Sequence, residues 1–355
     1  MNPGMDNTQV TLIVGATGAA ASRILERGRA QPGQTLIGLS RHKPAGDNLW
    51  LTADLDDVRR LTEALATRPD ISRIVYASRA PHGETGVEDV PGNLRMLRNL
   101  VDAAEASLPG LAHIHLIHGA KWYGMHLGPY RTPSREDDPR HPPPNFYYDQ
   151  QDFIAGRQRG KGWVWSTSRP NFVLDVAPGR ARNMVSTLGA YAAICRELDE
   201  PFDFPGWPST WNALHEVTDA KLLADGVLWM IGEPRCANRA FNMTNGDAFR
   251  WSDLWPFLAE QFGCRPGGVA SRYMTFWSDG KDAVWERIRA RDGLALPLDQ
   301  VASWPFFDFV MGMGYDVLCS MTSAREAGFN GFVNSWTMFS DQIAAYRAAR
   351  ILPPI

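Results

Sequence analysis

The stretch VTLIVGATGAAA, residues 10–21, decides the fold. Its first five residues are apolar or β-branched, which predicts a short buried strand. Gly15 then permits a tight turn, and Gly18 lets backbone N–H groups approach a pyrophosphate. Ala21 is small enough for the following helix, residues 19–29, to pack close to the strand. Glycines in such a turn can serve structure alone, but the succession of strand, turn and helix predicts a dinucleotide-binding turn.

Further apolar runs alternate with helix-like segments through the first half of the chain. The apolar runs are residues 35–39, 71–77, 112–117 and 163–168, and helix-like segments include residues 93–106 and 148–157. This alternation is typical of a parallel sheet covered by helices on both faces. We therefore predict an α/β fold built on a Rossmann-type, doubly wound parallel sheet.

The second half of the chain has a different character. After Pro170 the alternation fades, and the sequence becomes rich in Trp, Gly and Pro, with helix-like segments at residues 184–197, 218–231 and 252–262. We expect residues 1–170 to form the nucleotide-binding domain with the reactive side chains. Residues 171–355 should form a smaller, mostly helical substrate-binding and lid region, with some segments returning to the Rossmann core.

Composition excludes several classes of protein. A chain of 355 residues with 44% hydrophobic content can bury a large core. The net charge of −3 and the scattered Lys and Arg residues argue against nucleic-acid binding. The polar residues 1–9 do not resemble a signal peptide, and no run approaches the ~20 apolar residues of a membrane helix, so we expect a cytoplasmic protein without a membrane partner.

Cysteine and histidine spacing predicts no metal site. The four cysteines are far apart without a C-x-x-C pair, which favours free thiols over disulfides or a zinc site. His113 and His115 alternate on one strand and His118 follows, but no acids or cysteines stand at ligand spacing.

The end of the second predicted strand indicates which nicotinamide cofactor binds. It reads LSRHK, residues 39–43, without the acid that usually binds the ribose hydroxyls of NAD. Ser40 and Arg41 suit the 2′-phosphate of NADPH, since a guanidinium can grip it through two hydrogen bonds. A solvated basic turn is the alternative. Asp54, followed by Leu55, is placed either to read the adenine edge or to cap the next helix.

The segment NFYYD, residues 145–149, holds the candidate reactive tyrosine. In short-chain dehydrogenases a tyrosine donates a proton to the substrate carbonyl, and a lysine one helical turn later lowers its pKa. Here Gln151 and Asp152 stand four residues after the two tyrosines, so the usual lysine is absent.

Lys121 is the best replacement cation. It follows the apolar run at residues 112–117, at the carboxyl edge of the predicted sheet where ligands bind. It precedes Tyr147 by 26 residues, with a turn-rich loop between them. A surface lysine and a packing tyrosine remain the alternative reading of these features.

Several motifs resemble one enzyme family over nearly the whole chain, including the half that ordinary dehydrogenases do not share. The chain resembles the plant progesterone 5β-reductase and iridoid synthase-like enzymes, an atypical branch of the extended short-chain dehydrogenases. The matching segments are VGATG (14–18), Lys121 with Tyr123, NFYYD (145–149), Arg169-Pro170, YAAIC (191–195), AFN (240–242), NGD (245–247), LAEQFG (258–263) and GFNGF (328–332).

The resemblance implies a catalytic pair, Tyr147 and Lys121, and NADPH-dependent reduction of the activated double bond of an enone or enal. With the residues above, we assign the following to cofactor binding: Gly15, Thr17, Gly18, Ala19, Ser40, Arg41, Asp54, Leu55, Ala77, Ser78, Pro170 and Asn171. To the substrate pocket we assign Trp122, Tyr130, Tyr148 and Phe329.

The expected mechanism is a 1,4-reduction of a small-molecule enone or enal. Hydride goes to the β-carbon while Tyr147 stabilises the enolate oxygen, a contribution on the order of 3 kcal/mol. Lys121 adds positive potential. Three other functions stay open: carbonyl reduction by the same pair, sugar epimerisation or dehydration, and a non-catalytic NADP-binding sensor. The aromatic content is compatible with a homodimer and does not require one.

Overall fold

A seven-stranded parallel sheet organises the first body of the computed structural model, which describes residues 9–81 and 88–355. The strand order is β11-β6-β5-β4-β1-β2-β3, and every neighbouring pair is parallel. The strands are β1 (Gln9–Val14), β2 (Gln34–Ser40), β3 (Trp50–Thr52), β4 (Ile71–Tyr76), β5 (His113–Ile117), β6 (Val164–Pro170) and β11 (Arg239–Met243). The predicted α/β, Rossmann-type sheet is confirmed. The polar start of the chain, residues 1–8, lies outside the described residues.

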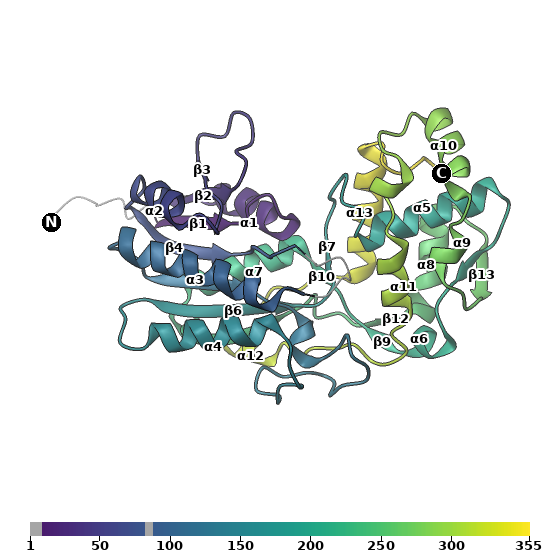
Figure 1. Ribbon diagram of the computed structural model, residues 1–355. Coiled ribbons are helices and arrows are strands. Elements are labelled where there is room, and N and C mark those ends of the chain that lie inside the picture. Colours follow the sequence, from purple (N-terminus) through teal and green to yellow (C-terminus); the bar gives the residue numbers. More distant parts are fainter. Residues whose placement is uncertain (1–8, 82–87) are drawn as a thin grey trace.

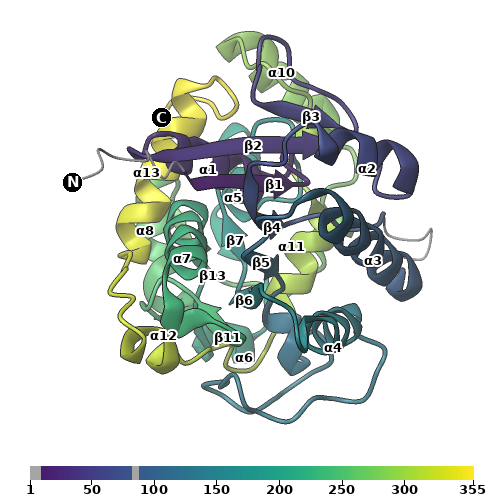
Figure 2. The same ribbon diagram turned by 90° about the vertical axis from the view of Figure 1, so that its left-hand side faces the viewer.

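Helices cover both faces of this sheet, so its central strand β1 is buried on both sides. On β1, Leu12 packs towards one layer of helices and Ile13 towards the other. Figure 2 looks along the sheet and shows α1 and α7 on one face and α2, α3 and α4 on the other. These helices are α1 (Ala19–Arg29), α2 (Val58–Ala66), α3 (Val90–Ser107), α4 (Phe146–Gln158) and α7 (Ala220–Gly232).

A second, mostly helical body lies beside the sheet (Figure 1). Its core surrounds three fully buried tryptophans, Trp251, Trp255 and Trp285. Helix α5 is buried on nearly every side, as expected of a helix that is apolar all round. The elements are α5 (Met184–Glu197), β8 (Phe202–Phe204), α6 (Pro208–Asn212), β9 (Leu214–His215), β12 (Phe249–Arg250), α8 (Trp251–Phe262), β13 (Pro266–Val269), α9 (Met274–Trp277), α10 (Lys281–Asp292), α11 (Trp304–Met311) and α13 (Ser335–Ala348).

Segments after residue 170 return to the sheet. Helix α7 covers one face of it, and β11 forms its edge strand. Short elements lie at the sheet edge or between the two bodies: β7 (Val173–Leu174), β10 (Thr218–Asp219), α12 (Thr322–Glu326) and the 3₁₀ turns η1 (Ala120–Tyr123) and η2 (Pro234–Cys236). A third 3₁₀ turn, η3 (Leu298–Gln300), belongs to the helical body. None of the helices in residues 9–81 and 88–355 is both long and apolar enough to cross a membrane.

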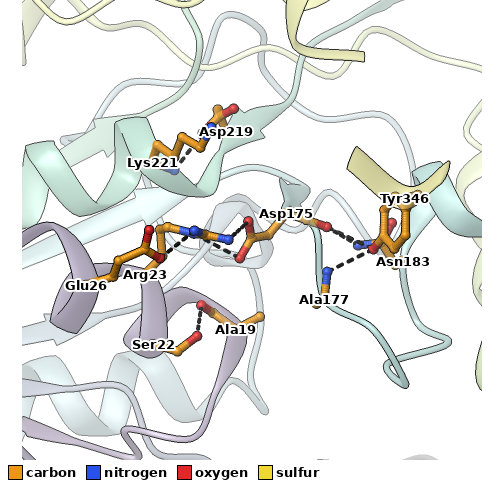
Figure 3. A network of polar contacts seen from close by, with 10 residues as sticks. All are labelled: Ala19, Ser22, Arg23, Glu26, Asp175, Ala177, Asn183, Asp219, Lys221 and Tyr346. Atoms are coloured by element: carbon orange, nitrogen blue, oxygen red, sulfur yellow. Dashed lines mark hydrogen bonds and ion pairs between the residues drawn. The ribbon is translucent and has the colours of Figure 1, made fainter. Parts of the chain in front are cut away.

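Asp175 joins the two bodies just after β7. Figure 3 shows its side chain against Arg23 of α1, with Asn183 and Tyr346 on the other side. The Arg23 guanidinium donates to Oδ1 at 2.7 Å, while the Asp175 carbonyl accepts from Asn183 at 2.7 Å and from the Tyr346 hydroxyl at 3.0 Å. The Tyr346 hydroxyl in turn accepts from Ala177 N at 3.0 Å. The chain around residues 175–183 is therefore held from both bodies.

Candidate active site

Gly15 brings the first turn close to the end of β4. Its φ of +78° lies in the left-handed region that favours glycine. A Cβ at this position would lie 2.7 Å from Ser78 Oγ and 3.0 Å from the Ser78 backbone N. Glycine is therefore required twice, once for the backbone conformation and once for the contact with Ser78.

The amino end of α1 is open to an anion. Its N-cap, Gly18, has no side chain to cap the helix, and the first turn carries no acid. The first N–H groups of a helix lack intrahelical partners, and the helix dipole favours negative charge there. Ser40 and Arg41 lie across the same cleft from this turn. Arg180, from the chain held around Asp175, also donates a hydrogen bond to the Thr17 carbonyl within the turn.

A cleft of about 490 Å³ runs along the carboxyl edge of the sheet at this turn. Most of the predicted cofactor residues line it, namely Gly15, Thr17, Gly18, Ser40, Arg41, Asp54, Leu55, Ala77 and Ser78. Ala19 is the first residue of α1, next to the cleft. Pro170 and Asn171 lie at the end of β6 and do not line it.

Ser40, Arg41 and Asp54 line the cleft in different ways. Ser40 Oγ donates to the His42 carbonyl at 2.7 Å and accepts from Trp50 Nε1 at 3.2 Å, whereas Arg41 is exposed. Asp54 accepts from Asp56 N at 3.0 Å. It does not cap α2, because Asp57 does so. Of the two predicted roles of Asp54, reading the adenine edge or capping the next helix, the capping role is wrong.

Asn145 connects the elements that carry the two candidate catalytic residues. Its Oδ1 accepts from Tyr147 N at 3.1 Å and caps α4, so the helix begins at Phe146. Its Nδ2 donates to the Lys121 carbonyl at 3.0 Å. One buried amide thus joins η1 to the start of α4, through two residues that are 24 positions apart in the sequence.

The Tyr147 hydroxyl lies at the carboxyl ends of β5 and β6. A Cβ at Gly119 would be 3.3 Å from this hydroxyl and 3.5 Å from the Pro170 carbonyl. Among the residues that the structure describes, none hydrogen-bonds the hydroxyl. The His118 ring packs on the phenol, with 4.8 Å between ring centres. Pro170 therefore lies beside Tyr147 rather than in the cleft.

Charges nearby act on the Tyr147 phenol in opposite directions. Burial raises the pKa of Tyr147 to about 12, the Arg79 charge lowers it, and the Glu88 charge raises it. His118 is neutral, because burial and the Arg169 charge hold its pKa well below the usual value. The tyrosine therefore stays protonated at neutral pH and is available as a hydrogen-bond donor.

No hydrogen bond joins the Lys121 ammonium to the Tyr147 hydroxyl. Its ammonium donates to Glu88 Oε1 at 2.8 Å, and the Arg79 guanidinium donates to the same oxygen at 2.6 Å. Burial alone would raise the pKa of the Glu88 carboxyl, but the Lys121 hydrogen bond and the charges of Lys121 and Arg79 hold it below its usual range. The action of Lys121 on Tyr147 stays a prediction.

Three of the four predicted pocket residues belong to one aromatic cluster with Tyr147. Trp122, Tyr130 and Tyr148 share it, and Phe172, Phe309 and Tyr315 pack against it. The Tyr148 hydroxyl donates to the Trp122 carbonyl at 2.5 Å. Trp122 is in turn covered by the Arg169 guanidinium, 3.7 Å from the ring centre. Tyr148 and Trp122 thus form a packed wall behind the phenol.

Phe329, the fourth predicted pocket residue, lies apart from this cluster. This ring packs on Trp229, 5.2 Å between centres, in the core between α7 and the sheet. The turn at Gly328 directs the chain beneath α7, away from the aromatic cluster.

Sequence reasoning missed the roles of Asn145, Glu88, Arg79 and Arg180. The helix-capping pattern before Phe146 was a usable signal for Asn145, since Asn is a preferred N-cap residue. No local pattern pairs Glu88 with Lys121, because 33 residues separate them.

The two histidines on β5 are buried and form hydrogen bonds to serines of the neighbouring strand β6. His113 and His115 share the Ser166 hydroxyl at 2.7 and 2.8 Å, and His115 also contacts Ser168 at 3.0 Å. Within residues 9–81 and 88–355, no group of three or more His, Cys, Asp or Glu side chains is arranged to hold a metal. All four cysteines are free.

Comparison with known proteins gives consistent matches over most of the chain. The PRISE-like Rossmann-fold domain matches residues 72–353. An (S)-8-oxocitronellyl enol synthase of Nepeta racemosa is 33% identical, covering 97% of this chain and 91% of that protein. The 3-oxo-Delta(4,5)-steroid 5-beta-reductase of Arabidopsis thaliana is 31% identical, covering 99% and 95%.

Solved structures share the fold at much lower identity. A UDP-N-acetylglucosamine 4-epimerase from Bacillus cereus aligns with a TM-score of 0.67 at 15% identity, covering 98% of both chains. RMD from Pseudomonas aeruginosa, complexed with NADPH, aligns with a TM-score of 0.65 at 14% identity, covering 96% of this chain and 99% of that one. These likenesses concern the fold alone.

Proposed function

Because the chain belongs to the PRISE-like Rossmann-fold family, we propose that it uses NADPH to reduce the carbon–carbon double bond of an enone or enal. The names of two relatives support this proposal. One is a reductase of 3-oxo-Delta(4,5)-steroids, in which the double bond is conjugated to a ketone, and the other forms an enol. An enol or enolate is the product expected when such a double bond accepts hydride.

The cleft residues fit NADPH. The uncapped amino end of α1 suits the pyrophosphate, with Arg180 beside the turn. Ser40 and the exposed Arg41 suit the 2′-phosphate, and the cleft of about 490 Å³ has the size of a nucleotide site. When bound, NADPH would supply the hydride that goes to the β-carbon of the substrate.

The observation that carries the proposal is the Tyr147 hydroxyl. Among the described residues it has no hydrogen-bond partner, and it lies at the sheet edge beside Gly119 and the Pro170 carbonyl. A phenol with a pKa of about 12 remains protonated at neutral pH and can donate to the substrate carbonyl oxygen. As that oxygen gains negative charge, one well-placed donor contributes on the order of 3 kcal/mol.

The remaining residues of the site have supporting roles in this mechanism. Arg79 and Lys121 bring positive potential to the side of the phenol, partly balanced by Glu88. The aromatic wall around Trp122 and Tyr148 keeps water away from the reacting face. The α-carbon then takes its proton from solvent, so no further acid is required.

Turnover of a simple cyclic enone tests the proposal. We expect NADPH consumption with formation of the saturated ketone, and a fall in kcat of about 100-fold in Tyr147→Phe. Tyr273→Phe, which removes an exposed phenol from the second body, serves as the matched control and should keep wild-type rates. An allylic alcohol as product would make the protein a carbonyl reductase. Binding of NADPH without turnover of any enone or aldehyde would favour a sensor.

A further inference from the structure

Glu88 holds two cations at the edge of the sheet where the reactive tyrosine lies. Lys121 and Arg79 both donate to its Oε1, at 2.8 and 2.6 Å. The three side chains come from three places in the fold: the first half of η1, the chain after β4, and the residue before the cap of α3. The Glu88 side chain is only 19% exposed, so its carboxylate is largely shielded from solvent.

The group lies against the catalytic helix. The Arg79 guanidinium sits over the Phe146 ring, 5.4 Å from its centre, and Phe146 is the first residue of α4. The charges of Arg79 and Glu88 both reach the Tyr147 phenol and act on it with opposite sign. Arg182, from the chain after β7, feels the same two charges.

We propose that Glu88 is a positioning residue of the site, which holds Lys121 and Arg79 together beside Tyr147 and sets the electrostatic potential at the phenol. Only the kinetic part of its test rests on the proposed function. The carboxylate reduces the net charge of the group from two positive charges to one. Without it, Lys121 loses the partner that fixes its ammonium, and the phenol loses a nearby negative charge.

Opposite shifts from two substitutions distinguish this role from a structural one. Glu88→Gln keeps the size of the side chain and an accepting oxygen but removes the charge, so the pKa of Tyr147 should fall by about one unit. Arg79→Gln removes the opposing charge, so the pKa should rise. A general loosening of the fold would not produce shifts of opposite sign.

Two histidines near the phenol are neutral at neutral and alkaline pH. His118 is neutral, and burial together with the Lys121 charge lowers the pKa of His126 to about 4. His141 approaches the Lys121 carbonyl at 3.3 Å and the Asn145 amide at 3.1 Å, and neither contact involves the Glu88 or Arg79 side chain.

Glu105 provides a matched control. Its carboxylate also holds one arginine and one lysine, Arg157 at 2.7 Å and Lys161 at 3.3 Å, and its side chain is 16% exposed. It lies on α3, and its ion pairs join α3 to the carboxyl end of α4, away from Tyr147. Glu105→Gln therefore removes an equivalent ion-pair group without changing the charges that act on the phenol.

The experiment places 3,5-difluorotyrosine at position 147 of the full-length, ligand-free protein and follows its titration by ¹⁹F NMR. Fluorination lowers the phenol pKa into a range where the protein stays folded. The expected result is a lower pKa in Glu88→Gln, a higher pKa in Arg79→Gln, and no change in Glu105→Gln. An unchanged pKa in Glu88→Gln, or an equal shift in Glu105→Gln, overturns the proposal.

Steady-state kinetics with a cyclic enone are the second test of the role of Glu88. Glu88→Gln should lower kcat about tenfold with KM within twofold, since a displaced cation affects the reacting geometry more than substrate binding. An unchanged kcat overturns the proposal. If the wild-type protein reduces no enone, the proposed function fails, while the ¹⁹F titration still decides the role of Glu88.

Discussion

Asn145 shows how single hydrogen bonds build this site. Its side chain caps α4 through Tyr147 N and holds the Lys121 carbonyl with the opposite end of the same amide. Because the amide is 3% exposed, both bonds are shielded from water. The relative position of the two candidate catalytic residues therefore depends on one side chain that contributes no chemistry of its own.

Asn145→Ser separates the two functions of this residue. Asn145→Ala removes the cap of α4, which alone should lower the free energy of unfolding by about 1 kcal/mol. Serine can still cap α4, so Asn145→Ser should lower it by less. Neither variant reaches the Lys121 carbonyl, so both should lose enone turnover about tenfold or more. Urea unfolding and steady-state kinetics measure the two effects. Full activity in Asn145→Ser would show that the bond to Lys121 is dispensable.

At the scale of elements, the site forms where the carboxyl ends of β1, β4, β5 and β6 meet the amino ends of α1 and α4. The close approach of the turn after β1 to the chain after β4 requires Gly15, because any Cβ there would clash with Ser78. This contact places Ser78 at the edge of the cleft, next to the Arg79 side chain that holds Glu88.

Gly15→Ala should disturb both stability and cofactor binding. The positive φ alone costs about 1 kcal/mol in an alanine. Gly33→Ala is the matched control, because Gly33 has a φ of +74° with nothing within 4 Å of a Cβ. We expect a larger loss of unfolding free energy in Gly15→Ala than in Gly33→Ala, and weaker NADP⁺ binding by calorimetry only in Gly15→Ala. Equal losses and equal affinities would contradict the account.

The elements with a strong local pattern were predictable, and the contacts between them were not. The glycine turn, the parallel sheet and the position of Lys121 after β5 followed from apolar runs and turn residues. The three-residue strand β3 is too short to give such a pattern. Glu88 meets Lys121 only through the tertiary fold, and Phe329 belongs to a motif whose place under α7 depends on packing.

At the scale of the whole molecule, Asp175 joins the sheet body to the helical body. Its side chain accepts a hydrogen bond from Arg23 of α1. Its backbone carbonyl accepts hydrogen bonds from the side chains of Asn183 and Tyr346. Burial raises the pKa of Asp175, against the hydrogen bond and charge of Arg23, which lower it. A raised folded-state pKa means that this carboxyl favours folding most at low pH, and the benefit is lost as the pH rises through that pKa.

Arg23→Met leaves this buried carboxylate without its cation. We expect a loss of about 3 kcal/mol in unfolding free energy at pH 7, and a smaller loss at pH 5, where more of the carboxyl is protonated. The control is Arg27→Met on the same helix, whose partner Asp225 is 37% exposed; it should lose less than about 1 kcal/mol at both pH values. Urea unfolding at the two pH values measures this, and equal losses for both variants would be the contrary result.

In the proposed reaction, hydride reaches the β-carbon of an enone while Tyr147 stabilises the carbonyl oxygen. NADPH deuterated at its transferable position, a cyclic enone, and NMR of the product locate the hydride. We expect deuterium on the β-carbon of a saturated ketone, with the yield falling about 100-fold in Tyr147→Phe. Deuterium on the carbinol carbon of an allylic alcohol, or an undiminished yield in Tyr147→Phe, would contradict it.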